Sequence, residues 1–548
     1  MKFFVVCPRG LEAPLYQELT QIISLCRDGQ LHARLGMSAK DSQQLCATFS
    51  SAYAGEPPPK PTGGIEISGG FELAMAINLH SRIASRVLLQ LMHSPYKKEE
   101  DIYASTKKIT WEDWFSTEQT LRVDVTAQKS NLNSINFITL RIKDAICDRF
   151  REMSGKRPSI ETATPDVRVM AFLDATHATI YADTSGEALF KRGWRDEKGA
   201  APLKENLAAG ILALTGWQAD MPLFDPMCGS GTFLIEAGQI AKGIPPGAIR
   251  AGILSFTDTH QDVAKETIQD IPKIIPKVSP KEAPVNTSAP SVNTAWVAPV
   301  AVGSGQTINS PKNKPLPDPI KVESPIYREP SYKPTRVDLV SVVQGFGFHR
   351  LKPFQEKNIL PIWELLKQLA VLQMQAQSQQ VLRIAGSDIN EQMVGITKRN
   401  WQKAGLPGIP IVRQIDALVA KSPFGEMKKT GVLLFNPPYG ERIDIKGGRG
   451  DGDDAPKQRG ARDPLPKNIS DPVFVEFLAQ YGRHLKDQFD GWQVDVLTAD
   501  MGLPGQLRMK ETKRTPLFNG AIECRLFRFE IRKNPQVKAT DQTPEPEE

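Results

Sequence analysis

The sequence lacks the motifs of several common classes of enzyme. Its six cysteines are scattered and form no CxxC pair, which argues against a disulfide framework and against a zinc site. The seven histidines form no HExxH pair, and no GxSxG motif is present, so neither a zinc hydrolase nor a serine hydrolase is supported. We therefore expect no bound metal.

Long apolar runs are also missing. No stretch approaches the roughly 20 apolar residues that span a bilayer, and Pro8 and Arg9 interrupt the N-terminus before the core of a signal peptide could form. With a hydrophobic fraction of 40% and a charged fraction of 24%, the sequence predicts a soluble, cytoplasmic protein with no membrane partner. The formal net charge of +6 permits a polyanionic partner without requiring one.

The 548 residues are too many for one core and predict several domains. Short strands and amphipathic helices are mixed up to about residue 185, which indicates small α+β units, and the apolar spacing predicts one helix over 71–92. From about residue 190 strands and helices alternate in order. This alternation predicts an α/β domain with a mostly parallel sheet wrapped by helices.

Three segments have compositions that cannot build a core. Thirteen prolines and many polar residues fall within 271–335, and we expect a disordered insertion over 258–338. Glycine and charged residues dominate 445–466, which we expect to be a second insertion. The acidic end of the chain, 533–548, is expected to be a disordered tail.

The first motif with chemical content is a glycine-rich turn between a strand and a helix, DPMCGSGTF at 225–233. Glycines suit a sharp turn at the carboxyl end of a strand, where a ligand must approach the backbone. Neither a Gly-Lys-Ser/Thr sequence nor a full GxGxxG is present, so a phosphate-binding loop is not favoured. An ordinary turn explains the two glycines alone about equally well.

Acidic residues follow two further apolar segments. Asp388 comes after the strand predicted at 381–385, where a carboxylate can accept hydrogen bonds from ribose hydroxyls. The alternative is a plain helix N-cap. Asp416 follows the apolar segment 409–412 and could accept the amino group of an adenine, or it could be an ordinary surface residue.

The most specific motif is Asn436-Pro437-Pro438-Tyr439, directly after the apolar strand at 432–435. Two prolines remove two N–H donors and stiffen the loop, so the Asn436 amide oxygen and the Pro437 carbonyl can both accept from one NH₂ group. Tyr439 can stack on the ring that carries this group. Methylation of an exocyclic amino nitrogen needs this arrangement, because the lone pair must face the methyl donor while the base is held.

In this order, DPMCGSGTF, GSDIN and FNPPYGER resemble the class I amino-methyltransferases. Four further stretches are similar to the THUMP-domain RNA guanine-N2 methyltransferases: MKFFVVCPRGLE at the start, INLHSRIASRVLLQL at 77–91, KRGWR at 191–195 and APLKENLAAGIL at 201–212. Within this family the chain most resembles the large-subunit rRNA enzymes without a second fused methyltransferase. The resemblance fails in the two insertions and the tail.

The resemblance implies a Rossmann-like methyltransferase domain over 190–532, after a ferredoxin-like domain over 1–65 and a THUMP RNA-binding domain over 66–185. It implies S-adenosyl-L-methionine (SAM) as cofactor and RNA as partner, in the form of rRNA or a ribosomal assembly intermediate. The target base would be held by Asn436, Pro437, Pro438 and Tyr439. The donor would be held by Asp225, Cys228, Gly229, Ser230, Gly231, Thr232, Phe233, Asp388, Ile389, Asp416, Ala417 and Asn436, with 202–206 on the far side of the pocket.

Cys228 is interpreted as a small packing residue, because an amine needs no covalent nucleophile once it is positioned. Other substrates stay open. A tRNA guanine is one, and adenine N6 in DNA is another, because adenine carries a similar conjugated amine. A binding protein without activity would need a degenerate site, whereas both loops are intact. Six basic residues on and after the helix expected at 135–150 could contact RNA phosphates or form a solvated helix face: Arg141, Lys143, Arg149, Arg151, Lys156 and Arg157.

Overall fold

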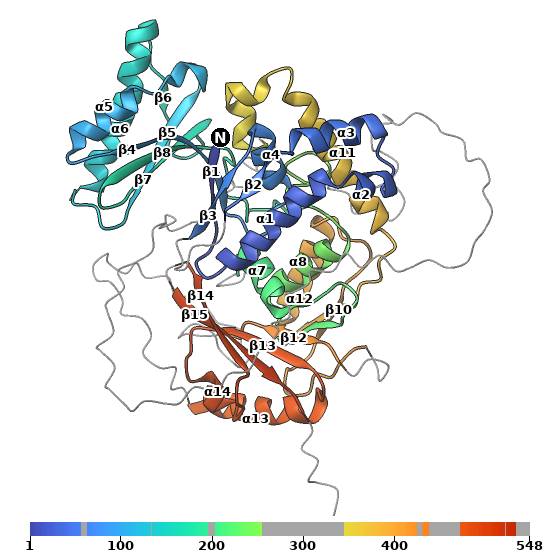
Figure 1. Cartoon of the computed structure of the whole chain (residues 1–548). Helices are drawn as coiled ribbons and strands as arrows, with labels where there is room; N and C mark the ends of the chain where they lie inside the picture. The colour runs from blue at the N-terminus through green and yellow to red at the C-terminus, as the bar shows by residue number, and fades with distance from the viewer. Residues whose placement is uncertain are drawn as a thin grey trace, which may run out of the picture.

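The structure is a computed structural model that describes residues 1–55, 63–132, 134–195, 203–254, 345–424, 430–437, 472–520 and 522–532. The insertions expected at 258–338 and 445–466 and the tail expected at 533–548 lie outside these ranges. Two sheets organise the chain, one from the N-terminal third and one from the rest (Figure 1). Helices α1 (Glu12–Arg27) and α7 (Glu205–Thr215) lie side by side between them.

The N-terminal sheet has eight strands in the order β2-β3-β1-β4-β8-β7-β5-β6. Its strands are β1 (Lys2–Val6), β2 (Tyr53–Ala54), β3 (Gly64–Ser68), β4 (Arg86–Pro95), β5 (Thr120–Ala127), β6 (Ser159–Ile160), β7 (Val167–Leu173) and β8 (His177–Asp183). β1 pairs antiparallel with both β3 and β4. The sheet therefore continues across residue 65, where the sequence suggested a boundary between two domains.

Helices cover one face of this sheet and enclose the core of the N-terminal half. Those that contact its strands are α1 (Glu12–Arg27), α4 (Phe71–His80), α5 (Glu99–Lys107) and α6 (Ile135–Ser154). Helices α2 (Gly29–Arg34) and α3 (Ala39–Thr48) pack against each other, and α3 packs against α1. Phe3 and Val5 of β1 face this core, whereas Val6 lies in a separate small cluster with Leu88 and Met170. Successive residues of a strand point to opposite faces, so the two clusters mark the two sides of the sheet.

The prediction of one helix over 71–92 is wrong. Helix α4 ends at His80, and β4 begins at Arg86. The Glu18 carboxylate of α1 accepts hydrogen bonds from Ser81 Oγ and from the backbone N–H groups of Arg82 and Ile83, which holds the chain out of a helical path. The apolar run 87–89 is buried within the sheet, and such a run fits a buried strand as well as a helix.

The second sheet has seven strands in the order β11-β10-β9-β12-β13-β15-β14. Its strands are β9 (Leu223–Asp225), β10 (Ile384–Asp388), β11 (Ile411–Gln414), β12 (Val432–Phe435), β13 (Gln493–Thr498), β14 (Lys513–Asn519) and β15 (Ile522–Glu530). The first five are parallel, and β15 is antiparallel to both of its neighbours. This confirms the predicted α/β domain with a mostly parallel sheet, preceded by an α+β region.

Helices α8 (Thr232–Ala241), α11 (Leu360–Ala376), α12 (Glu391–Lys403) and α13 (Pro472–Gln488) lie in the crossover connections that parallel neighbours require. Helix α7 (Glu205–Thr215) precedes β9, and α14 (Leu503–Gln506) lies between β13 and β14. The strand order reverses at β9, between β10 and β12. In open parallel sheets a ligand binds at the carboxyl ends of the strands where the order reverses. The fold therefore predicts a site beyond the ends of these three strands.

The two halves of the chain share one apolar core. A single cluster of buried side chains contains Phe3 of β1, Leu11 before α1, Leu207 of α7 and Leu526 of β15. The packing is close, because a Cβ added to Gly210 of α7 would lie 2.3 Å from the Leu11 side chain. Among the helices that the structure describes, none has the length and apolarity that crossing a membrane requires.

Candidate active site

Three separate sequence motifs meet at the edge of the second sheet. β9 ends at Asp225, β10 ends at Asp388, and β12 ends directly before Asn436. The 228–232 turn, here called the donor loop, follows β9 and leads into α8. The sequence placed these residues in one site, and the parallel pairing of β9 with β10 and β12 brings them to the same edge.

The glycines of the donor loop are required by its conformation. Gly229 and Gly231 have φ angles of +53° and +81°, in the left-handed region that side chains disfavour. A Cβ at Gly231 would also lie 2.5 Å from Thr397 Cγ2 of α12. Thr397 Oγ1 donates to the Gly229 carbonyl at 2.7 Å, and Asn400 Nδ2 donates to the Ser230 carbonyl at 3.2 Å. Helix α12 thus holds one side of the loop.

Asp388 connects β10 to the donor loop. Its Oδ2 accepts from the Gly229 N–H and its Oδ1 from the Asn390 N–H, both at 2.9 Å. The N-cap of α12 is Asn390, whose side chain accepts from Gln392 N, so the N-cap alternative for Asp388 does not hold. Burial raises the pKa of the Asp388 carboxyl despite the two hydrogen bonds. The neighbouring Ile389 side chain is 56% exposed, an apolar surface at the edge of the site.

Asp225 is buried at the centre of the site and accepts from Met227 N at 3.1 Å. Burial raises the pKa of its carboxyl well above the usual range, the Met227 N–H opposes this, and the charge of Asp388 adds to it. Asp416 lies at the same edge, because Ile415 N donates to the Asp388 carbonyl, and its own Oδ1 accepts from Leu418 N. The adjacent Ala417 is buried.

Asn436 carries a polar atom with no partner. Its Oδ1 is buried and accepts no hydrogen bond from the residues that the structure describes. Pro437 is buried beside it, while Pro438 and Tyr439 lie outside the described residues. Buried polar atoms nearly always have a hydrogen-bond partner. An unpartnered acceptor in a site therefore indicates that a bound ligand donates a hydrogen bond to it. An amino group is such a donor.

Sequence reasoning missed the residues that hold the donor loop from outside the motifs. Thr397 and Asn400 lie on α12, and no local pattern marked them. Arg195 belongs to the stretch KRGWR, which gave it no role in the site. In the structure its guanidinium donates to Ser230 Oγ and Thr232 Oγ1. The two hydroxyls expected to hold the donor therefore bond to protein. Within the described ranges, no group of three or more His, Cys, Asp or Glu side chains could hold a metal.

The state of Asp225 gives a test of the site. Its raised pKa means that the folded chain holds a proton that the unfolded chain releases above the usual carboxyl value of 3.8. Stability is therefore lost as the pH rises through this window. We expect Asp225→Asn to raise the melting temperature of the ligand-free chain more at pH 7 than at pH 4, while weakening the binding of a cationic ligand. Thermal melts at both pH values measure this, and an equal effect at both would contradict it.

Two family models match the chain. The model described as "RMKL-like, methyltransferase domain" matches residues 192–280 and 342–450, and the THUMP domain model matches 96–183. These matches confirm the domain types that the motifs indicated. The methyltransferase match contains β9, β10, β11 and β12 with all three motifs of the site.

Curated relatives agree with this assignment. The "Ribosomal RNA large subunit methyltransferase K/L" of Psychromonas ingrahamii is 29% identical over 501 residues, which cover 90% of this chain and 50% of that protein. The chain thus spans about half of that relative's length. A protein of Synechocystis sp. (slr0064), provisionally named as an RNA methyltransferase, is 25% identical over 531 residues, or 96% of each chain.

A solved structure shares the fold along the whole chain. SMU.472, provisionally described as a methyltransferase and complexed with SAH, superposes with a TM-score of 0.60 at 20% identity. The match covers 97% of this chain and 98% of that chain. At this identity the likeness concerns the fold alone.

Proposed function

We propose that this chain is a SAM-dependent RNA methyltransferase that modifies N2 of a guanine in large-subunit rRNA. The chain combines a THUMP domain with an RMKL-like methyltransferase domain. The observation that carries the proposal is the meeting of the donor loop, Asp388 and the unpartnered Asn436 Oδ1 at the reversal of the sheet. The names of the curated relatives support rRNA as substrate. The guanine-N2 specificity comes from the motif resemblance.

The residues of the site fit SAM. Asp388 would offer a carboxylate to the ribose hydroxyls, the exposed Ile389 and the buried Ala417 would offer apolar contacts to an adenine, and Asp416 would accept from its amino group. Asp225 places a carboxyl group where a positively charged ligand would stabilise the ionised form. SAM supplies an electrophilic methyl group on a sulfonium.

The chain's own contribution to the chemistry is to position the amine. Asn436 Oδ1 and the Pro437 carbonyl would accept from the two N–H bonds of the target amino group and turn its lone pair toward the donor. A positioned amine is already a nucleophile, so no side chain has to act as a strong base. Positioning of this kind can lower the barrier by about 7–11 kcal/mol. A base in paired or stacked RNA must leave the stack to reach Asn436, at a cost of a few kcal/mol.

Nucleoside mass spectrometry tests the substrate. A strain without this protein should lose N2-methylguanosine from its large-subunit rRNA and keep the modified nucleosides of its tRNA. Loss from tRNA with intact rRNA would replace the proposed substrate by a tRNA guanine. Loss of N6-methyladenine from DNA would overturn the RNA assignment.

Asp388 should contribute to donor binding in two ways. Asp388→Ala removes a charged acceptor from the ribose and releases the Gly229 N–H, so we expect the affinity for SAM to fall by about 1.5–3 kcal/mol. Calorimetry on the full chain measures this. Asp174→Ala is the matched control, because Asp174 also accepts from two backbone N–H groups but lies between β7 and β8. Equal SAM affinity of both variants would remove Asp388 from the donor site.

Tyr439 is proposed to stack on the flipped base, which is worth about 1–3 kcal/mol. If the ring does the holding, Tyr439→Ala should raise the KM for RNA clearly more than Tyr439→Phe. Steady-state kinetics with saturating SAM separates the two variants. Equal losses would indicate that the hydroxyl forms a hydrogen bond instead.

A further inference from the structure

We propose that Arg195 is a positioning residue that fixes the donor loop in its SAM-binding conformation, an inference that rests on the proposed SAM-dependent function. Arg195 lies ten residues before α7 begins. It belongs to none of the three motifs that follow β9, β10 and β12. Its role follows from where its guanidinium donates. Helix α12 holds one side of the loop through a backbone carbonyl. Among the described residues, it is Arg195 that donates to the side-chain hydroxyls of the loop.

The guanidinium makes four hydrogen bonds to residues that the structure describes. Nη1 donates to Ser230 Oγ at 2.8 Å, and Nη2 donates to Thr232 Oγ1 at 2.7 Å and to the Leu203 carbonyl at 3.2 Å. Nε donates to Glu205 Oε1 at 2.7 Å. One planar group thus connects both hydroxyls of the donor loop to the start of α7.

The surroundings keep this group in place. The side chains of Arg195 and Glu205 are each only 7% exposed, so the pair is shielded from water and the Glu205 charge compensates the buried cation. The guanidinium lies 4.9 Å from the centre of the buried Trp194 ring, which adds a cation–π contact. A lysine has one ammonium and cannot present this fixed fork of donors.

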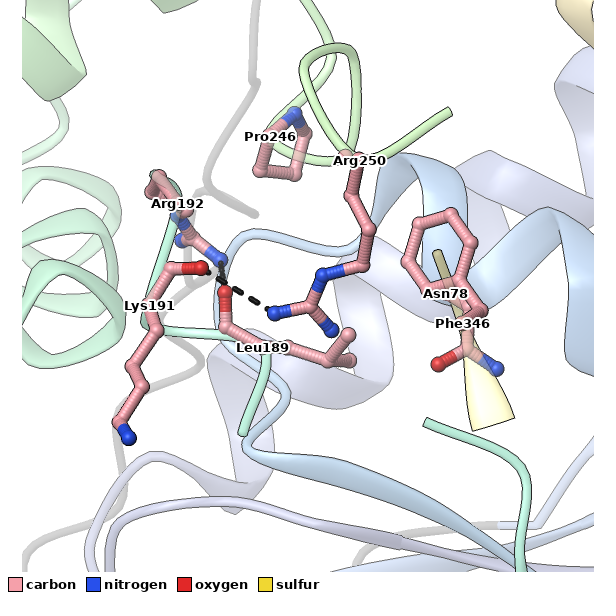
Figure 2. Close-up of a pocket in the computed structure, with 8 residues that line it drawn as sticks. Asn78, Leu189, Lys191, Arg192, Pro246, Arg250 and Phe346 are labelled. Atoms are coloured by element: carbon pink, nitrogen blue, oxygen red, sulfur yellow. Dashed lines mark hydrogen bonds between the residues drawn. The ribbon is translucent and has the colours of Figure 1, made fainter. Parts of the chain in front are cut away.

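The chain before Arg195 is anchored as well. Arg192 donates to the carbonyl of Leu189, and Arg250 donates to the carbonyl of Lys191 (Figure 2). Arg192 also donates to the carbonyl of Arg82. The Arg192 side chain also pairs with Glu236 of α8, the helix that the donor loop begins. The segment that leads to Arg195 is therefore anchored to the rest of the protein. A residue that fixes the position of the donor loop needs such an anchored backbone.

The position of Ser230 and Thr232 matters because each follows a glycine, Gly229 or Gly231, and glycine has little intrinsic preference for one conformation. Without Arg195 the loop would keep its contacts to α12 and Asp388 but lose both side-chain anchors. A ligand would then have to order the loop on binding, and its apparent affinity would fall.

Calorimetric titration of the full chain with SAM tests this. Arg195→Lys should weaken SAM binding by about tenfold or more, the equivalent of one hydrogen bond to a charged group. In a Ser230→Ala, Thr232→Val background the same Arg195→Lys change should cost no more than about twofold further, because its two partners on the donor loop are already gone. A structural role alone would cost the same in both backgrounds.

The matched control is Arg528→Lys. Arg528 donates to Asp495 at 2.9 Å and to the Leu214 carbonyl in the same domain but does not contact the donor loop. It should lower the melting temperature and leave SAM affinity within about twofold of the wild type. If Arg195→Lys does not fold, Glu205→Gln replaces it, because it keeps the shape and removes the charge that fixes the guanidinium.

The outcomes separate the two proposals. A wild-type chain that does not bind SAM contradicts the proposed function. A wild-type chain that binds SAM, with Arg195→Lys within twofold of it or with additive losses in both backgrounds, overturns only the role of Arg195. The role of Arg195 is supported if Arg195→Lys weakens SAM binding in the wild-type background and weakens it by no more than about twofold further in the Ser230→Ala, Thr232→Val background.

Discussion

Asn436→Ala is expected to lower kcat on RNA by about 10²-fold while SAM binding stays measurable, because a reacting group displaced by about 1 Å can lose this factor. The amine would keep only the Pro437 carbonyl as acceptor and could turn its lone pair away from the donor. Single-turnover methylation with saturating SAM and RNA measures the effect directly. The donor loop and Asp388 are unchanged in this variant, so calorimetry should still detect SAM.

The stability of the same variant should change little. Asn436 Oδ1 accepts no hydrogen bond within the described part of the chain, so removing it breaks none there. Asn78 is the matched control, because it is a buried asparagine with partners at both ends of its amide: its Nδ2 donates to Ala74 O and Thr184 Oγ1, and its Oδ1 accepts from Ser185 Oγ. Asn78→Ala should cost about 1–3 kcal/mol of stability.

The two asparagines should therefore behave in opposite ways. Asn436→Ala should have a lower turnover at a nearly constant melting temperature. Asn78→Ala should have a lower melting temperature and a nearly constant turnover per folded molecule. Wild-type turnover in Asn436→Ala would remove this residue from the chemistry. A large fall in its melting temperature would instead mean that Asn436 supports the fold.

The second large effect is expected from charges on and after α6 that capture RNA. The structure divides the six basic residues named from the sequence into two groups. Three form ion pairs with nearby carboxylates and make up the paired set: Lys143, Arg149 and Arg151. The other three have no carboxylate partner among the described residues and make up the unpaired set: Arg141, Lys156 and Arg157. Cations without a carboxylate partner are better placed to neutralise phosphates.

Replacing the unpaired set by glutamine should weaken RNA binding and lower the slope of log K against log salt by about 3, one unit for each phosphate that is no longer neutralised. The paired set, replaced in the same way, removes the same formal charge and should change the slope clearly less. Equilibrium binding at several salt concentrations compares the two. SAM affinity should be unchanged in both, and equal slopes would leave α6 a solvated surface without a role in RNA capture.

Point variants are preferable to a separate catalytic fragment. The N-terminal sheet and the second sheet share one apolar core, and Leu11 packs directly against α7. Cutting the chain near residue 186 would expose this surface, so loss of activity in the fragment would not distinguish RNA capture from misfolding.

The sequence alone determined the class of the second domain and the motifs of its site. Order of strands and helices, glycines in the turn after β9, and prolines after β12 are local properties, because they follow from which backbone angles each residue permits. The strand at 432–435 was predicted to the residue for this reason. The same local reasoning led us to propose Asn436 as a residue of the site.

Only the tertiary structure decided which residues support that site. Arg195 and Thr397 are separated by 202 positions in the chain, yet both hold the donor loop, and no local pattern records such a contact. The apolar run 87–89 became a strand because a neighbouring strand and the Glu18 carboxylate were available to it. Hydrogen bonds and packing between distant segments exist only after the chain has folded, so residues whose role is to connect them leave little signal in the sequence.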